Sequence, residues 1–253
     1  MTKRRLGLSA MLLCAGLIPP VHAQTNTSIY RGKQVTYRTV NGMAVDQGDI
    51  VLGTAAELEA AHTRATTRTT TRTGRELAAA QPTPQAATVA YSANLWTASG
   101  GVVHVPYVLR PDTTGTSASA VNTINNAIAS FNISFLGIVQ WVPRASETDY
   151  VNFDLSPANT GGGCVSYVGR IGGVQTITGA INCSQAVLMH EMGHAIGLWH
   201  EHTRMDRNAF VSVRANAIDK PNQSNFDQET FNENDLGLYD YASLMHYSAF
   251  LFG

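Results

Sequence analysis

The 253-residue chain is 44% hydrophobic and 14% charged, which fits one globular domain of about 160 residues with a smaller appendage. Its net charge of −1 is unevenly divided, because residues 1–89 hold ten basic and five acidic residues (net +5) and residues 90–253 hold seven and thirteen (net −6). The acidic main part has no basic face, which excludes nucleic-acid binding.

Residues 1–23 have the pattern of a secretory signal peptide. Basic residues 3–5 form its charged start, residues 6–18 are mostly apolar, and Val21-His22-Ala23 gives a small-residue cleavage site. The apolar stretch is too short to span a bilayer, and no other long apolar run occurs. The sequence therefore predicts a secreted protein, extracellular or periplasmic, without a membrane anchor.

The next segment contains short alternating apolar stretches up to residue 53 and a predicted short helix at residues 57–61. It continues with an Arg/Thr-rich tract, residues 62–74, and an Ala/Pro-rich tract. Such tracts cannot bury a core, so we expect a mobile linker that proteases cut between Arg72 and Ala93. The excess of basic residues in the front half favours attraction to the acidic part, although the basic residues of the leader and the Arg/Thr tract explain it equally well.

The main domain is predicted to begin with a strand at residues 102–109. Pro106 inside this strand favours an edge position or a bulge. A helix is predicted at residues 117–131, because four apolar residues recur on one face: Val121, Ile124, Ile128 and Phe131. Residues 138–142 and 150–155 predict two further strands.

A second helix is predicted from about Ser184 to Gly197, and the polar segment 208–238 predicts mostly loops. Two helices and several strands in this order indicate an α+β fold with a twisted sheet packed on two helices. Cys164 and Cys183 flank the segment before the second helix. In an exported protein one disulfide is favoured, with two free thiols as the alternative.

The candidate catalytic residues lie in one motif, H-E-x-x-H-x-x-G-x-x-H, at residues 190–200. His190 and His194 lie four residues apart, so a helix presents both imidazoles on one face. Gly197 ends the helix and turns the chain so that His200 reaches the same point. Three neutral imidazoles and an open position indicate a catalytic Zn²⁺ site, with Glu191 beside it to take a proton from water. The alternative is that these histidines have no common function. A chance match at all five fixed positions of the motif is rare.

This extended motif resembles the zinc signature of the metzincins, and its continuation through residues 201–207 resembles the astacin family of zinc metalloendopeptidases. Residues 239–247, Tyr-Asp-Tyr-Ala-Ser-Leu-Met-His-Tyr, are similar to the astacin Met-turn. The resemblance implies a zincin-like α+β protease of two subdomains, with a twisted mixed sheet and an active-site helix. It also implies that Met245 lies beneath the metal. Tyr247 would ligate zinc at rest and swing away to stabilise the oxyanion of the reaction.

An upstream pentapeptide, Asp46-Gln47-Gly48-Asp49-Ile50, is similar to the astacin propeptide motif Phe-x-Gly-Asp-Ile, with Asp46 in place of the aromatic residue. The resemblance implies that Asp49 binds zinc in a latent form and displaces the catalytic water. A plain Asp-containing turn is the alternative.

The resemblance implies three further roles. Residues 161–169 would border the cleft and pair antiparallel with an extended polypeptide substrate. Glu201 would meet the mature N-terminus, with a solvated surface glutamate as the alternative. Arg204 and Asp206 would form a structural ion pair.

We therefore predict a signal peptide (1–23), a propeptide with a flexible linker (24–89) and an astacin-like catalytic domain (90–253). The predicted function is a bacterial-type secreted zinc endopeptidase, made as a zymogen that its own propeptide inhibits. The alternative is a non-catalytic zinc-containing binding module or an inactive fragment. Astacins continue well beyond the Met-turn, so we expect the chain, which ends at Gly253, to be C-terminally truncated.

Overall fold

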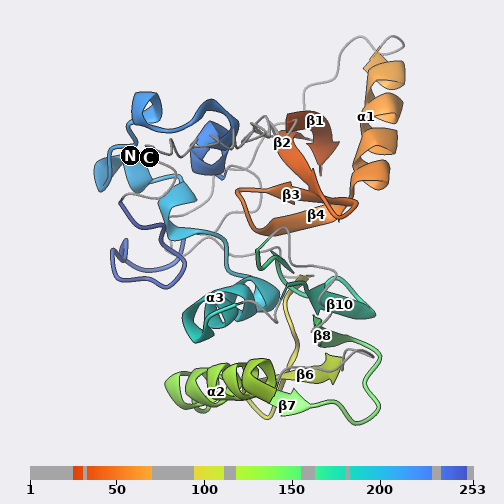
Figure 1. Ribbon diagram of the computed structural model, residues 1–253, viewed down its shortest axis with the longest axis vertical. Helices are drawn as coiled ribbons and strands as arrows, with labels where there is room; N and C mark the ends of the chain where they lie inside the picture. The colour runs from red at the N-terminus through yellow and green to blue at the C-terminus, as the bar shows by residue number, and fades with distance from the viewer. Residues whose placement is uncertain are drawn as a thin grey trace, which may run out of the picture.

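The computed structural model describes residues 25–30, 33–69, 94–110, 118–154, 163–179, 183–229 and 235–249. Figure 1 shows two sheets, one above the other, with α3 between the upper sheet and α2. The predicted signal peptide and the predicted cleavage region lie outside the described residues. Among the helices that are described, none has the length and apolar character needed to cross a membrane.

An N-terminal lobe, residues 25–69, consists of a four-stranded antiparallel meander and one helix. Its elements are β1 (Thr25–Tyr30), β2 (Lys33–Val40), β3 (Met43–Asp46), β4 (Ile50–Thr54) and α1 (Ala55–Thr69). Asn41 and Gly42 both have positive φ, 49° and 79°, in the turn between β2 and β3. An Asn-Gly pair with this backbone matches the twist of the flanking strands and fixes the hairpin.

The predicted short helix is longer than expected, because α1 extends into the Arg/Thr-rich tract as far as Thr69. For residues 62–69 this replaces the predicted mobile linker, and the rest of the tract lies outside the described residues. A capping box starts α1: the Glu57 N–H donates to Thr54 Oγ1 at 3.2 Å, and the Thr54 N–H donates to Glu57 Oε2 at 2.9 Å. Leu58 is buried in the core of the lobe. Starting a helix is the costly step, so once the first turn is fixed, poor helix formers such as threonine can extend it.

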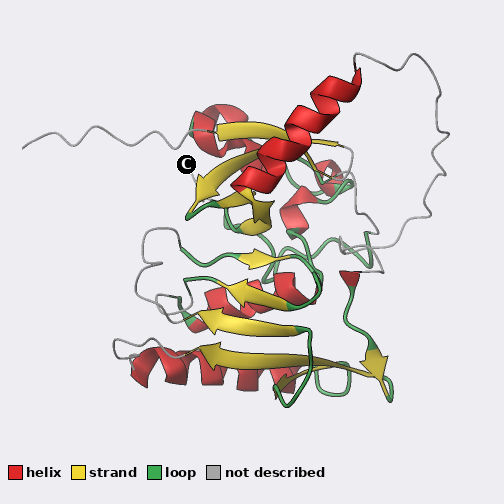
Figure 2. Ribbon diagram, turned by 90° about the vertical axis from the view of Figure 1, so that its right-hand side faces the viewer, coloured by secondary structure: helices red, strands yellow, loops and turns green. Residues whose placement is uncertain are grey.

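The C-terminal part, residues 94–249, is built on a second sheet with strand order β10-β8-β6-β5, in which β7 pairs with the other edge of β6. Figure 2 shows these strands side by side with helices packed behind them. All the pairings are parallel except that of β5 with β6. The elements are β5 (Ala98–Ser99), β6 (Val102–Arg110), α2 (Ala118–Ser134), β7 (Val139–Pro143), β8 (Tyr150–Asp154) and β10 (Val174–Ile177). The predicted helix, strands and α+β class are confirmed.

Pro106 does not lie on an edge strand, because β6 is paired on both sides. On one side β7 runs along Val103 to Tyr107 without a break. On the other side β5 pairs only as far as Val103, and β8 begins at Tyr107. Proline has no backbone N–H to donate. In the gap between β5 and β8 no neighbouring strand requires such a donor from β6. Strand β6 as a whole is thus not an edge strand, but at Pro106 itself its side toward β5 and β8 is open, which agrees with the predicted edge position.

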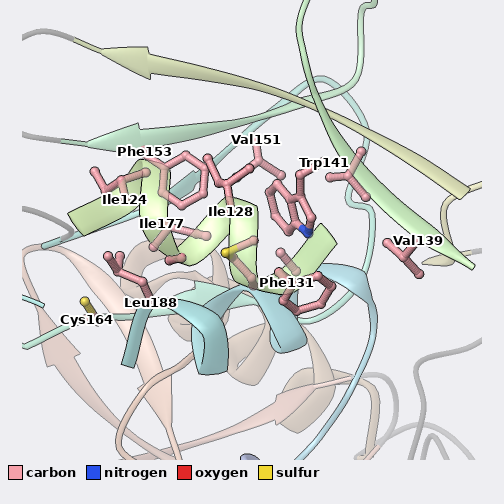
Figure 3. Packing of buried hydrophobic residues seen from close by; sticks show 14 of the residues in the cluster. Ile124, Ile128, Phe131, Val139, Trp141, Val151, Phe153, Cys164, Ile177 and Leu188 are labelled. Atoms are coloured by element: carbon pink, nitrogen blue, oxygen red, sulfur yellow. The ribbon is translucent and has the colours of Figure 1, made fainter. Parts of the chain in front are cut away.

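The main core lies between α2, α3 (Gln185–Ile196) and the second sheet (Figure 3). Helix α2 contributes the predicted face, of which Ile124, Ile128 and Phe131 are buried. Trp141 of β7 packs edge-on to Phe131, with ring centroids 6.1 Å apart. This core fixes α3 against the sheet.

The two sheets meet at β9 (Ser166–Tyr167), the described strand within the predicted cleft border. It pairs in parallel with β4 of the N-terminal lobe, Ile50 opposite Ser166 and Val51 opposite Tyr167. The Ser166 N–H also donates to the Asp49 carbonyl at 3.0 Å. Four short 3-10 helices follow α3 in the described residues: η4 (Glu201–Thr203), η5 (Arg207–Ala209), η6 (Ala215–Ala217) and η7 (Lys220–Phe226). The last two lie wholly within residues 208–238, the segment predicted as mostly loops.

The predicted disulfide is present between Cys164 and Cys183. Cys183 immediately precedes Ser184, the residue that caps α3, and Cys164 lies two residues before β9. The bond therefore ties the strand that meets the N-terminal lobe to the start of the α3 helix.

Replacing both cysteines by serine should lower the free energy of unfolding by about 3 kcal/mol, because the bond closes a loop with a sequence separation of 19 residues. Urea denaturation of the oxidised wild type and the double variant measures this. An unchanged midpoint would show that the bond does not contribute to stability.

Candidate metal centre

Helix α3 has both of its predicted boundaries. Ser184 is its N-cap, and its hydroxyl accepts from the Val187 N–H at 3.3 Å. Gly197 ends it with φ 118°, a backbone conformation that favours glycine, and its N–H donates to the His194 carbonyl at 2.8 Å. The capping serine and the terminal glycine, both visible in the sequence, are therefore sufficient to predict where this helix begins and ends.

The two faces of α3 have different tasks. Leu188, Met192 and Ala195 are fully buried in the main core. His190 and His194 point the other way, and the turn after Gly197 brings His200 to them, as predicted. Burial of one face thus fixes the direction of the imidazoles on the other.

Each imidazole is held through its Nδ1 atom by an oxygen acceptor. His190 Nδ1 lies 2.8 Å from the Leu244 carbonyl, and His194 Nδ1 lies 2.7 Å from the Leu198 carbonyl. His200 Nδ1 lies 2.9 Å from Oε1 of Gln47. Because these oxygens accept hydrogen bonds, each Nδ1 carries the proton and each Nε2 presents a lone pair.

The Nε2 atoms converge on one point, where the Asp49 carboxylate meets them. The ligand atoms of these four residues all lie within 4.8 Å of one another. The Nε2 atoms of His190 and His200 are 3.2 Å apart, and the Asp49 carboxylate oxygens lie 3.3, 3.7 and 3.2 Å from Nε2 of His190, His194 and His200. Four ligands bound to one tetrahedral Zn²⁺ at about 2.0–2.1 Å lie roughly 3.3 Å from one another. The donor set therefore has the size that zinc requires.

Two buried atoms in this group support the fit. His194 Nε2 and Asp49 Oδ1 have no hydrogen-bond partner within the described part of the chain. Leaving buried polar atoms unpaired is costly. Lone pairs facing one another at these distances repel, so a cation among them resolves both problems.

The electrostatics of His194, His200 and Asp49 fit a cation site, whereas contact with Asp49 outweighs burial and raises the pKa of His190. Burial lowers the pKa of His194 to about 4 and also lowers that of His200, which keeps both rings neutral, as metal ligands must be. Burial alone would raise the pKa of Asp49. The three histidines around the carboxylate outweigh burial and hold this pKa well below its usual value. Asp49 is therefore an ionised carboxylate.

Glu191 is buried beside this group with 1% of its surface exposed. Its Oε2 atom finds no hydrogen-bond partner among the residues that the structure describes. Burial and the negative charge of Asp49 raise the pKa of Glu191 well above its usual value. Glu191 also lines a cavity of about 360 Å³ together with His190 and Tyr247. The predicted proton acceptor thus lies at the wall of a cavity next to the histidines.

The predicted Met-turn lies directly beneath α3. Met245 is 5% exposed, and its carbonyl accepts from the Glu201 N–H at 2.9 Å. A Cβ atom at Gly193 would come within 2.6 Å of the Met245 sulfur. The glycine therefore permits the close approach of helix and turn.

Tyr247 lies beside the histidines, with its ring 4.7 Å from that of His200 and stacked at 4.0 Å on that of His202. Its hydroxyl donates to the backbone oxygen of Gln47. Burial and the charges of Asp49 and Glu191 raise its pKa, so the hydroxyl stays protonated. In this arrangement Tyr247 binds the N-terminal lobe, and its predicted place as a resting ligand stays a prediction.

Gln47 was missed by the sequence reasoning. It is 3% exposed and has an unusual positive φ of 48°. Its side chain holds His200, its carbonyl holds Tyr247, and its N–H donates to the Asp46 carboxylate at 2.8 Å. Its place within the Asp-x-Gly-Asp pentapeptide was the only signal, and no local rule assigns a contact to that position.

The residues after His200 form an ion-pair network around the buried Arg204. Arg204 makes a two-pronged contact with Asp206, at 2.8 and 2.7 Å, and donates to Glu201 at 3.0 Å. The predicted structural ion pair is confirmed. Glu201 also accepts from the Asp240 N–H at 2.9 Å, so it is engaged within the C-terminal part.

Comparisons with known proteins agree with this geometry. The family model of the Astacin peptidases matches residues 89–253. The chain is 36% identical over 158 residues to the astacin-like metalloendopeptidase of Gallus gallus, covering 60% of this chain and 35% of that protein. It is also 36% identical over 160 residues to the low choriolytic enzyme of Oryzias latipes, covering 61% of this chain and 54% of that protein. The chain thus spans about a third to a half of these relatives.

A solved structure gives the same result. The chain resembles high choriolytic enzyme 1, a hatching enzyme zinc-protease from Oryzias latipes, with a TM-score of 0.53 and 31% sequence identity. The match covers 64% of this chain and 77% of that chain.

Replacing Gln47 by methionine should weaken zinc binding by the full chain about tenfold, because His200 loses the acceptor that orients it. Competition with a chromogenic chelator measures this affinity. Gln34→Met, at an exposed glutamine of the same lobe, is the matched control. Equal zinc affinity in both variants would show that Gln47 does not orient His200 for the metal.

Proposed function

Because the chain belongs to the astacin family of zinc metallopeptidases, we propose that it is a zinc-dependent endopeptidase that is exported as a latent zymogen. The convergence of three Nε2 atoms on one point carries this proposal. A buried glutamate faces a cavity beside that point. These are the groups that water-mediated peptide hydrolysis requires.

His190, His194 and His200 are the proposed protein ligands of the metal. Zn²⁺, when bound, lowers the pKa of a water molecule and polarises a substrate carbonyl. Glu191 accepts the proton of that water and passes it to the nitrogen of the leaving amine. Its burial and the cavity in front of it support this role.

Tyr247 is the proposed donor to the oxyanion that forms when the carbonyl is attacked. Its hydroxyl now donates to the Gln47 carbonyl, so departure of the N-terminal lobe frees it. A donor aimed at the developing charge contributes roughly 3 kcal/mol of barrier lowering. The stacked contacts with His200 and His202 keep the ring close to the metal ligands.

Latency rests on two contacts of the N-terminal lobe, which we assign to a propeptide, residues 24–89. The Asp49 carboxylate takes the position among the histidines that water needs. Strand β4 pairs with β9, the strand proposed to bind an extended polypeptide substrate. The lobe therefore excludes both the nucleophile and the substrate.

Export and processing complete the proposal. The signal-peptide pattern of residues 1–23 supports secretion, extracellular or periplasmic. Proteolysis between Arg72 and Ala93 would separate the lobe from the catalytic domain, residues 90–253. A non-catalytic zinc module has no need of a buried carboxylate beside the metal, so Glu191 favours an enzyme over that alternative.

Glu191→Ala should leave zinc bound and lower casein hydrolysis by the processed protein at least about a hundredfold, because the proton acceptor is lost. Zinc content by atomic emission and the rate of casein cleavage test this together. Glu147→Ala, at an exposed glutamate of the same domain, is the control. Substantial hydrolysis by the Glu191→Ala protein would refute the assignment of the base.

Asp49→Ala should make the uncut precursor hydrolyse a small peptide substrate, because water regains its place among the histidines. The lobe still covers β9, so we expect partial activity compared with the processed enzyme. Asp219→Ala, at an exposed aspartate, should stay latent. A fully latent Asp49→Ala precursor would reject Asp49 as the switch.

A further inference from the structure

Trp199 lies in the metal motif, next to His200, yet its indole packs into the N-terminal lobe. It is 4% exposed. The buried residues around it all come from the lobe: Val35, Tyr37, Ala44, Ile50, Leu52 and Leu58. From the C-terminal part, partly buried Val168 joins the same cluster.

This side chain is part of the buried apolar cluster of the lobe. A folded unit of residues 25–69 is close to the size at which a protein core becomes too small to be stable alone. A buried tryptophan adds a large apolar surface, about 150–250 Å². Buried tryptophans surrounded by smaller apolar residues are typical energetic centres of protein interfaces.

Strand β4 carries the contact on both of its faces. Ile50 and Leu52 face the cluster of Trp199, while Val51 packs with Val165 of the C-terminal part. The edge of β4 continues into the ladder with β9. The lobe is therefore held on the C-terminal part by an apolar patch and by the pairing of a strand edge. Both contacts are additional to that of the Asp49 carboxylate with the histidines.

We propose that Trp199 anchors the N-terminal lobe on the C-terminal part after the linker is cut, so that cleavage of the linker does not by itself activate the enzyme. This inference rests on the proposed zymogen function. On this proposal the lobe stays bound as an inhibitor after the linker has been cut. The enzyme then becomes active only when the lobe dissociates or when a second cut is made within the lobe. The partner of the Trp199 surface is thus residues 25–69 of the same chain.

The test places a recognition site for a specific protease between residues 75 and 85 of the full chain. After cutting, dilution followed by native mass spectrometry gives the dissociation constant of the lobe. The wild-type lobe should stay bound after cutting. Trp199→Ala should raise the dissociation constant about 30-fold, equivalent to about 2 kcal/mol, and Trp199→Phe should raise it less.

Two further variants keep the test decisive. Leu52→Ala removes an apolar contact from the lobe side and leaves the metal motif untouched, so it should also weaken retention. Asp49→Asn should leave the lobe bound, because it removes a metal contact and preserves the Trp199 cluster. Separation of the wild-type lobe on cutting, or an unchanged dissociation constant in both Trp199→Ala and Leu52→Ala, would overturn the anchor.

The proposed function fails in a different way. Its failure would appear as absent zinc or absent peptidase activity in the separated C-terminal part. The anchor is measured by a dissociation constant, which does not depend on catalysis.

Discussion

The structure depends on three imidazoles whose Nε2 lone pairs are forced toward one point. His190 and His200 bring these atoms within 3.2 Å, a distance at which neutral lone pairs repel. A cation among them would relieve this repulsion, and oxygen acceptors at each Nδ1 prevent the rings from turning away. Asp49 supplies the negative charge that completes the group.

The scaffold supports this point from three directions. One face of α3 is buried against α2 and the second sheet, which fixes the direction of His190 and His194. The Met-turn approaches from below, and Gly193 leaves room for the Met245 sulfur. The disulfide ties the start of α3 to the strand that meets the N-terminal lobe. Rigid support matters because small displacements of metal ligands are costly in affinity and in catalysis.

The N-terminal lobe acts on the same point through contacts of different kinds. Asp49 contributes charge, and Gln47 contributes a hydrogen-bond acceptor for His200 and another for Tyr247. Trp199 packs against the apolar core of the lobe, and β9 pairs with β4 at the edge of the sheet of the lobe. Charge, orientation and apolar burial thus come from different side chains and from different kinds of contact.

The sequence by itself determined the features that depend on local spacing. The helical period placed His190 and His194 on one face, Ser184 and Gly197 set the ends of that helix, and its motif identified the metal. Tertiary structure alone decided the role of Gln47, because it meets His200 across 153 residues of sequence. It also decided that Pro106 is tolerated inside β6, because β5 ends and β8 begins on either side of this residue and leave the strand open there. Local rules describe one element at a time, whereas these outcomes depend on which elements meet.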